Sequence, residues 1–276
     1  MKQKIQAAIT RNLINLKGFK TNRKLIAIES DDWGSIRIPS AEVQKILVDK
    51  GVISLADPFS RYDALESETD LREMYDMLMK HKGGNGNPPV ITANCVVANP
   101  DFAKIKASGY QEYFYEDVRS TFARYPEHGN CFALWKEGID NKVFFPQYHG
   151  REHINVDLWM KRLQEGDKVF LEAFEHETFA ANPKASFSKG KNIMAALDYN
   201  TQQEREHKAQ VLKDGYRIFS ELMGFESKSF IAPCYIWDSA LEADLKGLGV
   251  RYLQGSKFQN IPNTDKSEYG RKYHYT

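Results

Sequence analysis

The chain has 276 residues, of which 42% are hydrophobic and 27% are charged. This composition supports a hydrophobic core and excludes a chain that is disordered throughout. The 38 basic and 37 acidic side chains leave a net charge of +1, which gives no general attraction to nucleic acids or anionic membranes. No run of about 18 apolar residues predicts a membrane-spanning helix, so we expect no membrane insertion.

The first 20 residues have apolar side chains at helical spacing, interrupted by polar residues. This pattern predicts an amphipathic helix and not an export signal; the apolar positions are Ile5, Ile9, Leu13 and Leu16. The three cysteines, Cys95, Cys131 and Cys234, are far apart and odd in number. We therefore expect no disulfide framework and a cytoplasmic location.

Short apolar runs then alternate with longer segments of helical spacing. The runs predict strands at 24–29, 90–98, 143–148, 229–237 and 251–254. Helices are expected after Ser40, which can cap the first of them, and at 71–81, 154–164, 201–223 and 239–248. Gly224 is expected to end the long helix, and Asp238 to cap the last one. Segment 169–174 is compatible with either a strand or a helix. The alternation predicts an α/β domain with a largely parallel sheet, open or closed into a barrel.

Two adjacent carboxylates, Asp31 and Asp32, directly follow the first apolar run. In parallel α/β folds, ligands bind at the carboxyl ends of the strands. One carboxylate of such a pair can bind a cation while its neighbour acts as a base. A helix cap or a local turn is the structural alternative for this pair.

Two histidines, His149 and His153, follow the third apolar run. If His149 opens a helix, both rings lie on one helix face and can ligate one metal ion. Together with Asp32 they form a three-ligand set that leaves positions open for water and substrate, as hydrolytic zinc sites do. Asp31 then remains as the base. Zinc is the expected ion, although nickel, cobalt, manganese and iron accept similar ligands.

A proline-containing turn follows the apolar run near residue 230. Pro233 sets a rigid turn, and Tyr235 and Trp237 are expected to line the same mouth, where aromatic rings suit sugars. Core packing is the alternative interpretation of Trp237. Trp33 and Arg151 complete the side chains that we expect to contact substrate.

With these motifs the sequence resembles the polysaccharide deacetylase family of carbohydrate esterases. The resemblance implies a (β/α)7-type distorted barrel, here a single domain over 1–276 with enlarged loops and a core of about 24–254. It implies Asp31 as the catalytic base and Asp32, His149 and His153 as metal ligands. The family's third motif, close to Arg-x-Pro-Tyr, aligns with Ile231 to Cys234. The resemblance therefore implies an oxyanion-binding N–H at Cys234, or at Tyr235 if the turn is displaced by one residue.

Three departures from the family pattern concern the site. The long spacing from Asp32 to His149 requires enlarged loops after the second and third strands. Ile231 replaces the motif's arginine, and the candidates to substitute for that arginine are Arg151 and Arg37. The family's Leu-x-His motif, which supplies the general acid, is absent after the third motif, leaving His274 and His176 as candidates. The chain also ends without a capped helix or final strand, so we expect a barrel that closes imperfectly or a protein that continues.

The sequence thus predicts a metal-dependent hydrolase that removes acetyl groups from an amino sugar or acetylated glycan. One alternative is a glycoside hydrolase that pairs Asp31 with Glu175 or Glu177, since such enzymes use two carboxylates. The other is a non-catalytic glycan-binding module that retains its metal. A carbohydrate is the expected partner in each case. The sequence does not specify the sugar or the oligomeric state.

Overall fold

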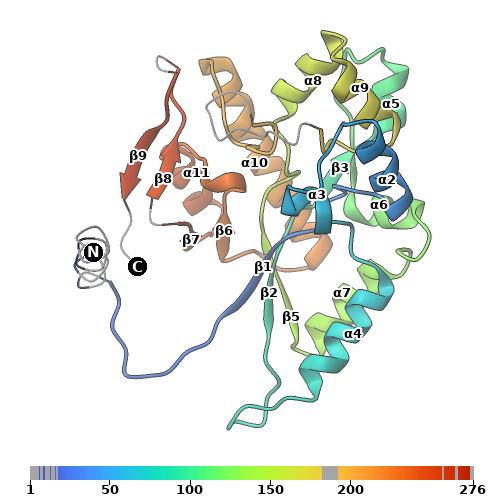
Figure 1. The fold of residues 1–276 in the computed structure, drawn as a ribbon. Helices are drawn as coiled ribbons and strands as arrows, with labels where there is room; N and C mark the ends of the chain where they lie inside the picture. The colour runs from blue at the N-terminus through green and yellow to red at the C-terminus, as the bar shows by residue number, and fades with distance from the viewer. Residues whose placement is uncertain are drawn as a thin grey trace.

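The computed structural model describes residues 18–181, 192–256, 258–264 and 267–273, together with positions 6, 9, 13 and 16. Its centre is a five-stranded parallel sheet (Figure 1). In spatial order the strands are β1 (Ile28–Trp33), β2 (Ile91–Cys95), β5 (Phe144–Tyr148), β6 (Ser229–Ile231) and β7 (Tyr252–Gln254). The spatial order follows the chain order without a reversal, so the sheet is wound in one direction, as in a β/α barrel.

The sheet curls so that its two edges approach each other. Gln254 Nε2, on β7, donates a hydrogen bond to Glu29 Oε2, on β1. This is a side-chain contact and not a backbone ladder between the edge strands. The expected seven-stranded barrel is therefore observed only in part, because the described residues form five parallel strands.

The segments between the strands carry most of the helices. Between β1 and β2 lie α2 (Ala41–Asp49), α3 (Pro58–Tyr62) and α4 (Glu68–Met79). Between β2 and β5 lie β3 (Ala98–Pro100), α5 (Phe102–Ala107), β4 (Tyr115–Asp117), α6 (Val118–Arg124) and α7 (Cys131–Asp140). Between β5 and β6 lie α8 (Val156–Gln164), α9 (Lys168–Glu175) and α10 (Gln202–Met223). The long connections expected after the second and third strands are thus present.

The last part of the chain adds a 3-10 turn (Pro233–Tyr235), α11 (Leu241–Gly247) and an antiparallel hairpin of β8 (Phe258–Ile261) and β9 (Gly270–Tyr273). The expectation that the chain ends without a final strand is therefore wrong, because β9 pairs with β8. Two hydrophobic clusters result. The first surrounds the sheet and includes Trp135 and Phe230. The second contains buried side chains of α2, α5, α8 and α9, which lie together in Figure 1. Ile36 and Ile154, which follow the ends of β1 and β5, belong to this second cluster, so those strand ends lead from one cluster into the other.

Several sequence-based predictions are confirmed. Ser40 caps α2, because its side chain accepts a hydrogen bond from the Val43 N–H. Thr201 begins α10 and Gly224 ends it with a φ of 81°, a left-handed conformation that glycine adopts without steric cost. The ambiguous segment 169–174 is helical and forms part of α9.

Other predictions are wrong in their details. The first strand begins at Ile28 and not at residue 24, and Ile26 is 91% exposed. The reason is that Ile28 pairs with Ile91, the first residue of β2, so the preceding residues have no strand beside them. The second strand ends at Cys95. Ala240, not Asp238, is the N-cap of α11.

The expected N-terminal helix lies largely outside the described residues. Ile5 is not among them, whereas Ile9, Leu13 and Leu16 are exposed. Among the described residues, no helix combines the length and the apolar character that crossing a bilayer requires.

Candidate metal centre

Asp32 lies in a distorted turn at the end of β1. The register between β1 and β2 shifts between Ser30 and Trp33, and the φ of Asp32 is 66°. A bulge of this kind redirects a side chain at a strand end. The left-handed conformation is costly for a residue other than glycine and persists where the surrounding structure holds it, often at functional sites.

His149 and His153 follow β5 in a loop, so they do not share the helix face that would arise if His149 opened a helix. Gly150, with a φ of 125°, adopts a conformation open to glycine and makes this loop possible. The His149 N–H donates to the Cys95 carbonyl, at 2.9 Å, and the Val97 N–H donates to the Arg151 carbonyl, at 3.0 Å. These bonds fix the loop against the end of β2.

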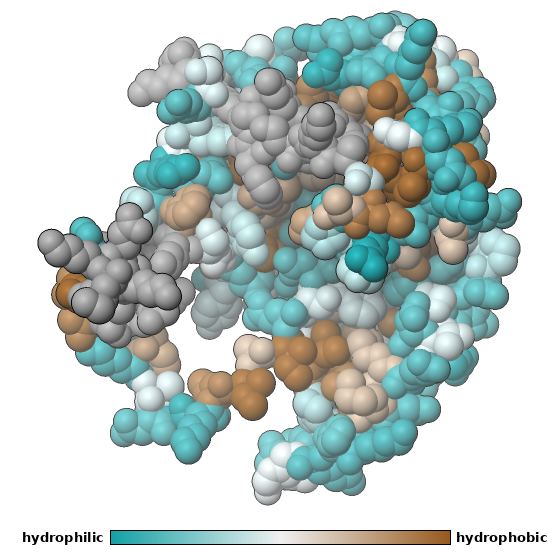
Figure 2. Space-filling model, in the orientation of Figure 1, coloured by the Kyte–Doolittle hydropathy of each residue, from teal (hydrophilic) through white to brown (hydrophobic). Residues whose placement is uncertain are grey.

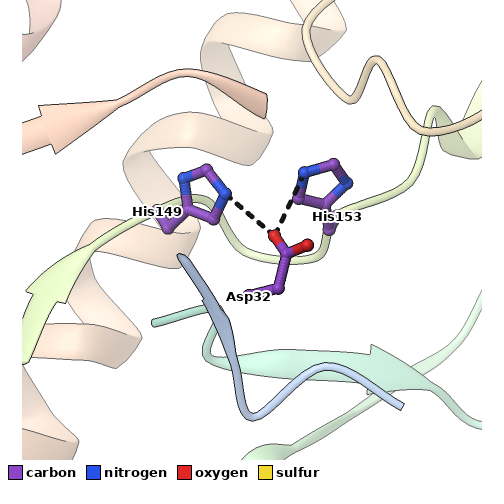
Figure 3. Close-up of side chains that lie close together, drawn as sticks. All are labelled: Asp32, His149 and His153. Atoms are coloured by element: carbon purple, nitrogen blue, oxygen red, sulfur yellow. Dashed lines mark hydrogen bonds and ion pairs between the residues drawn. The ribbon is translucent and has the colours of Figure 1, made fainter. Parts of the chain in front are cut away.

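The loop and the turn bring the three predicted ligands together (Figure 3). The Nε2 atoms of His149 and His153 lie 3.1 and 3.3 Å from Asp32 Oδ1. Both histidines are buried, and Asp32 is partly buried. The convergence is a tertiary feature, because Asp32 and His149 are 117 positions apart.

These three side chains fit a divalent cation. His149 Nδ1 lies 2.8 Å from the Ile231 carbonyl and donates to it, so Nε2, which faces Asp32, is the ring nitrogen available to a cation. Two imidazole nitrogens and one carboxylate oxygen form a donor set that zinc and related metals accept. Among the described residues, these are the side chains that come close enough to hold one ion.

The electrostatics of Asp32 and His153 also favour a cation. Burial raises the pKa of Asp32, but the neighbouring His153, His149 and Arg37 outweigh it and hold that pKa well below its usual range. Burial lowers the pKa of His149, yet the hydrogen bond and charge of Asp32 raise it overall. Burial lowers the pKa of His153 to about 4. Asp32 is therefore ionised and His153 neutral at pH 7, as metal ligands must be.

Asp31, the predicted base, lines the same cavity as the three ligands. Asn94, a buried residue of β2, donates from Nδ2 to Asp31 Oδ1 at 2.8 Å. The sequence analysis did not identify Asn94. Its signal is a polar amide within a largely apolar strand.

Arg37 reaches the acidic pair, but through Asp32. It donates to Asp32 Oδ2 at 3.1 Å and to Asp63 Oδ2 at 2.8 Å. Of the two candidates for the missing arginine, Arg37 is therefore the one at the site. Arg151 is buried in ion pairs with Glu152 and Asp214 and lines neither cavity described below, so its expected contact with substrate is not retained.

The turn at Pro233–Tyr235 distinguishes the two candidate oxyanion donors. The Tyr235 N–H already donates to the Ala232 carbonyl, at 2.8 Å. Within the described chain, no backbone acceptor is found for the Cys234 N–H. The geometry therefore favours Cys234. Burial raises the pKa of its thiol to about 12, so the thiol stays protonated and any role falls to the backbone.

The two predicted tryptophan contacts have different outcomes. Trp33 is half-buried against Phe144, with 5.2 Å between ring centroids, and lines a cavity. Trp237 is only 3% exposed, belongs to the cluster around the sheet and lines neither cavity. Core packing, the alternative interpretation, describes Trp237 better than contact with sugar.

The remaining candidates are not assembled at the site. His176 caps the end of α9 and contacts Glu172, 3.1 Å away. Glu175 and Glu177, proposed to pair with Asp31 in a glycoside hydrolase, instead form ion pairs with Lys106 and Arg124. None of the three lines a cavity beside Asp31. His274 lies outside the described residues.

Two adjoining cavities flank the acidic pair, and they share Asp31, Asp32, Arg37 and Phe59. The first, of about 340 Å³, contains the histidines and has a largely apolar wall formed by Ile53, Ala180, Ala181, Ile193, Met194 and others. Figure 2 shows hydrophobic surface around α3. The second, of about 350 Å³, is bordered by the segment between α3 and α4.

Comparisons with known proteins add little to this geometry. No protein-family model matches the sequence, and no curated protein matches it. Among solved structures, the chain is similar to the structure of IcaB from Ammonifex degensii. The identity is 8%, the match covers 83% of each chain and the TM-score is 0.30. A likeness this distant carries no functional argument, so the conclusions below depend on the geometry of the site.

Proposed function

We propose that the protein is a metal-dependent hydrolase that removes acetyl groups from an amino sugar or an acetylated glycan. The observation that carries this proposal is the convergence of Asp32, His149 and His153 beside Asp31 on one cavity. Three ligands with open positions, next to a carboxylate that is not a ligand, are the groups that hydrolysis of an acyl bond requires.

Each residue has a separate task in the proposed reaction. A bound divalent cation, for which we propose zinc, supplies Lewis-acid activation of a water molecule and of the acyl carbonyl. Asp31 accepts the proton of the attacking water, and Asn94 holds its carboxylate in place. The Cys234 N–H donates to the oxygen on which negative charge develops. Among the described residues we assign no acid for the leaving amine.

A carbohydrate is the proposed substrate because of the side chains around the metal centre. The first cavity includes the exposed rings of Phe59 and Tyr235 near the carboxylates. Aromatic faces pack against the apolar faces of sugar rings, while carboxylates accept hydrogen bonds from hydroxyls. All three cysteines are free, and we propose that the protein acts in a reducing compartment such as the cytoplasm.

Acetate release tests this function. The protein is freed of metal with a chelator, reloaded with zinc and incubated with N-acetylglucosamine oligomers. We expect acetate release that is lost on chelation and restored by zinc. New reducing ends in place of acetate would indicate a glycoside hydrolase. Sugar binding without any turnover would indicate a non-catalytic module, and either result would contradict the proposal.

A further inference from the structure

The second cavity is not used by the proposed reaction. It adjoins the metal centre through Asp31, Asp32 and Arg37, but neither histidine lines it. Its remaining wall comes from the end of β1 and from residues 62–66. At about 350 Å³ it has room for a group the size of one sugar ring.

Three buried polar atoms in residues of this wall have no hydrogen-bond partner within the described chain. They are Trp33 Nε1, Ser35 Oγ and Arg37 Nε. Ser35 is 4% exposed and Arg37 is 6% exposed. Buried polar groups are nearly always paired, and a small side-chain movement would let these three groups meet the oxygens of a ligand in the cavity. The Ser35 hydroxyl needs only a change of rotamer to meet such a ligand.

The cavity is also strongly acidic. Asp31, Asp32, Asp63 and Glu66 line it, and Arg37 is its basic residue among the described lining. Arg37 is already shared between Asp32 and Asp63. With a divalent cation at Asp32 and all four carboxylates ionised, the lining carries one net negative charge. A ligand group with a positive charge would balance it.

Glu66 is the clearest case of an unbalanced carboxylate. It accepts hydrogen bonds from the Gly34 N–H and from Trp135 Nε1, both at 3.1 Å, and both donors are neutral. These bonds fix the position of the carboxylate at the cavity. Burial raises its pKa to about 7, which agrees with the lack of a cationic partner.

Aromatic rings border the same cavity. Tyr62 is 71% exposed, and Phe59 is also exposed. The guanidinium of Arg61 lies over the Tyr62 ring, 5.1 Å from its centroid, and that of Arg37 lies 5.2 Å from the Phe59 centroid. A ring that has a guanidinium over one face can offer its other face to the C–H face of a pyranose.

We propose that the second cavity binds a sugar ring that carries a free, protonated amino group, next to the acetylated ring at the metal centre. The ring hydroxyls meet the unpaired polar atoms, and the ammonium meets the carboxylates. This inference rests on the proposed function for the choice of an amino-sugar chain as the ligand. It identifies the preferred substrate as a glycan that is already partly deacetylated.

Equilibrium binding tests the inference separately from turnover. The zinc-loaded protein is titrated calorimetrically with the tetramer of glucosamine and with the tetramer of N-acetylglucosamine, at low ionic strength. We expect the glucosamine tetramer to bind about tenfold more tightly, with a preference that weakens as salt is added. We expect the same preference after chelation, because the carboxylates of this cavity and not the metal provide it.

Variants separate charge from shape. Asp63→Asn should abolish the preference for the glucosamine tetramer. Its affinity should fall about tenfold, and that of the neutral tetramer less than about twofold. Ser35→Ala and Tyr62→Ala should weaken both tetramers by about three- to fivefold. Asp76→Asn is the matched control, because Asp76 is exposed on α4 and lines neither cavity. Removal of its charge should leave the affinity for both tetramers unchanged.

Several outcomes would overturn the inference. The first is equal affinity for the two tetramers. The second is a loss of preference in Asp76→Asn as large as that in Asp63→Asn. The third is unchanged binding in both Asp63→Asn and Tyr62→Ala. Tyr62→Ala keeps the test valid if Asp63→Asn fails to fold, because Tyr62 is on the surface. Acetate release without a preference refutes only this inference. A preference that persists without acetate release refutes only the proposed function.

Discussion

The two cavities share one wall but differ in chemistry. The first combines two buried histidines with apolar side chains such as Ile53 and Ile193, whereas the second combines carboxylates with unpaired polar atoms. Asp31 and Asp32 line both. The proposals assign two tasks that adjoin at this acidic pair: reaction at a metal in the first cavity and recognition of charge in the second.

His149→Ala should have the largest effect, and only on the first cavity. Loss of one of three ligands should lower metal affinity by more than about 100-fold and remove turnover with it. Metal content and acetate release measure both. His176→Ala is the matched control, because His176 lies at the end of α9 and lines neither cavity. Full metal content in His149→Ala would contradict the ligand set.

Asp31→Asn should separate reaction from metal binding. Because Asp31 is the proposed base, we expect turnover to fall by about 10² to 10⁴-fold while zinc content stays unchanged. Rates of acetate release, normalised to metal content, make the measurement. Retained turnover would refute the role of Asp31 as base.

Acidification should weaken metal binding in the first cavity. The pKa of His149 is raised above the ordinary value of 6.5, because the influence of Asp32 exceeds the opposing effect of burial. Protons therefore compete with the metal from a higher pH than at an ordinary histidine. Affinity should fall about tenfold per pH unit below that pKa and be constant above it.

A competition titration between pH 5 and 8 measures this dependence. His153, with a pKa of about 4, should add no competition over most of that range. Constant affinity down to pH 5 would show that His149 is not a ligand.

Asn94→Ala should have the smallest effect. Asn94 is a positioning residue that acts through Asp31, so we expect kcat to fall about three- to tenfold. The KM and the metal content should stay unchanged. A change in KM alone would indicate that Asn94 shapes the cavity and does not orient the base.

Much of the candidate metal centre was predictable because its residues directly follow strands. Asp31, Asp32, His149 and His153 each come after an apolar run, and the ends of parallel strands meet at one edge of a sheet. The path between His149 and His153 was not predictable, because their spacing also suits a helix. The backbone conformation of Gly150 and the hydrogen bonds to the end of β2 stabilise a loop instead.

The second cavity was not predictable for a related reason. Its wall depends on residues 62–66, whose position is set by contacts such as the Gly34–Glu66 hydrogen bond between distant parts of the chain. The prediction that the first strand begins at residue 24 was wrong for a different reason. Leu25 and Ile26 are apolar but lack a neighbouring strand, and apolar character alone does not create one.

The distance along the chain between the proposed metal ligands has a further consequence. An ion held by Asp32 and His149 joins residues 117 positions apart and acts as a reversible cross-link between β1 and β5. Since such an ion binds only the folded chain, a concentration of 100 times its Kd adds about 2.7 kcal/mol to the free energy of unfolding. The supply of metal would then control the lifetime of the protein against heat and proteases as well as its rate of reaction.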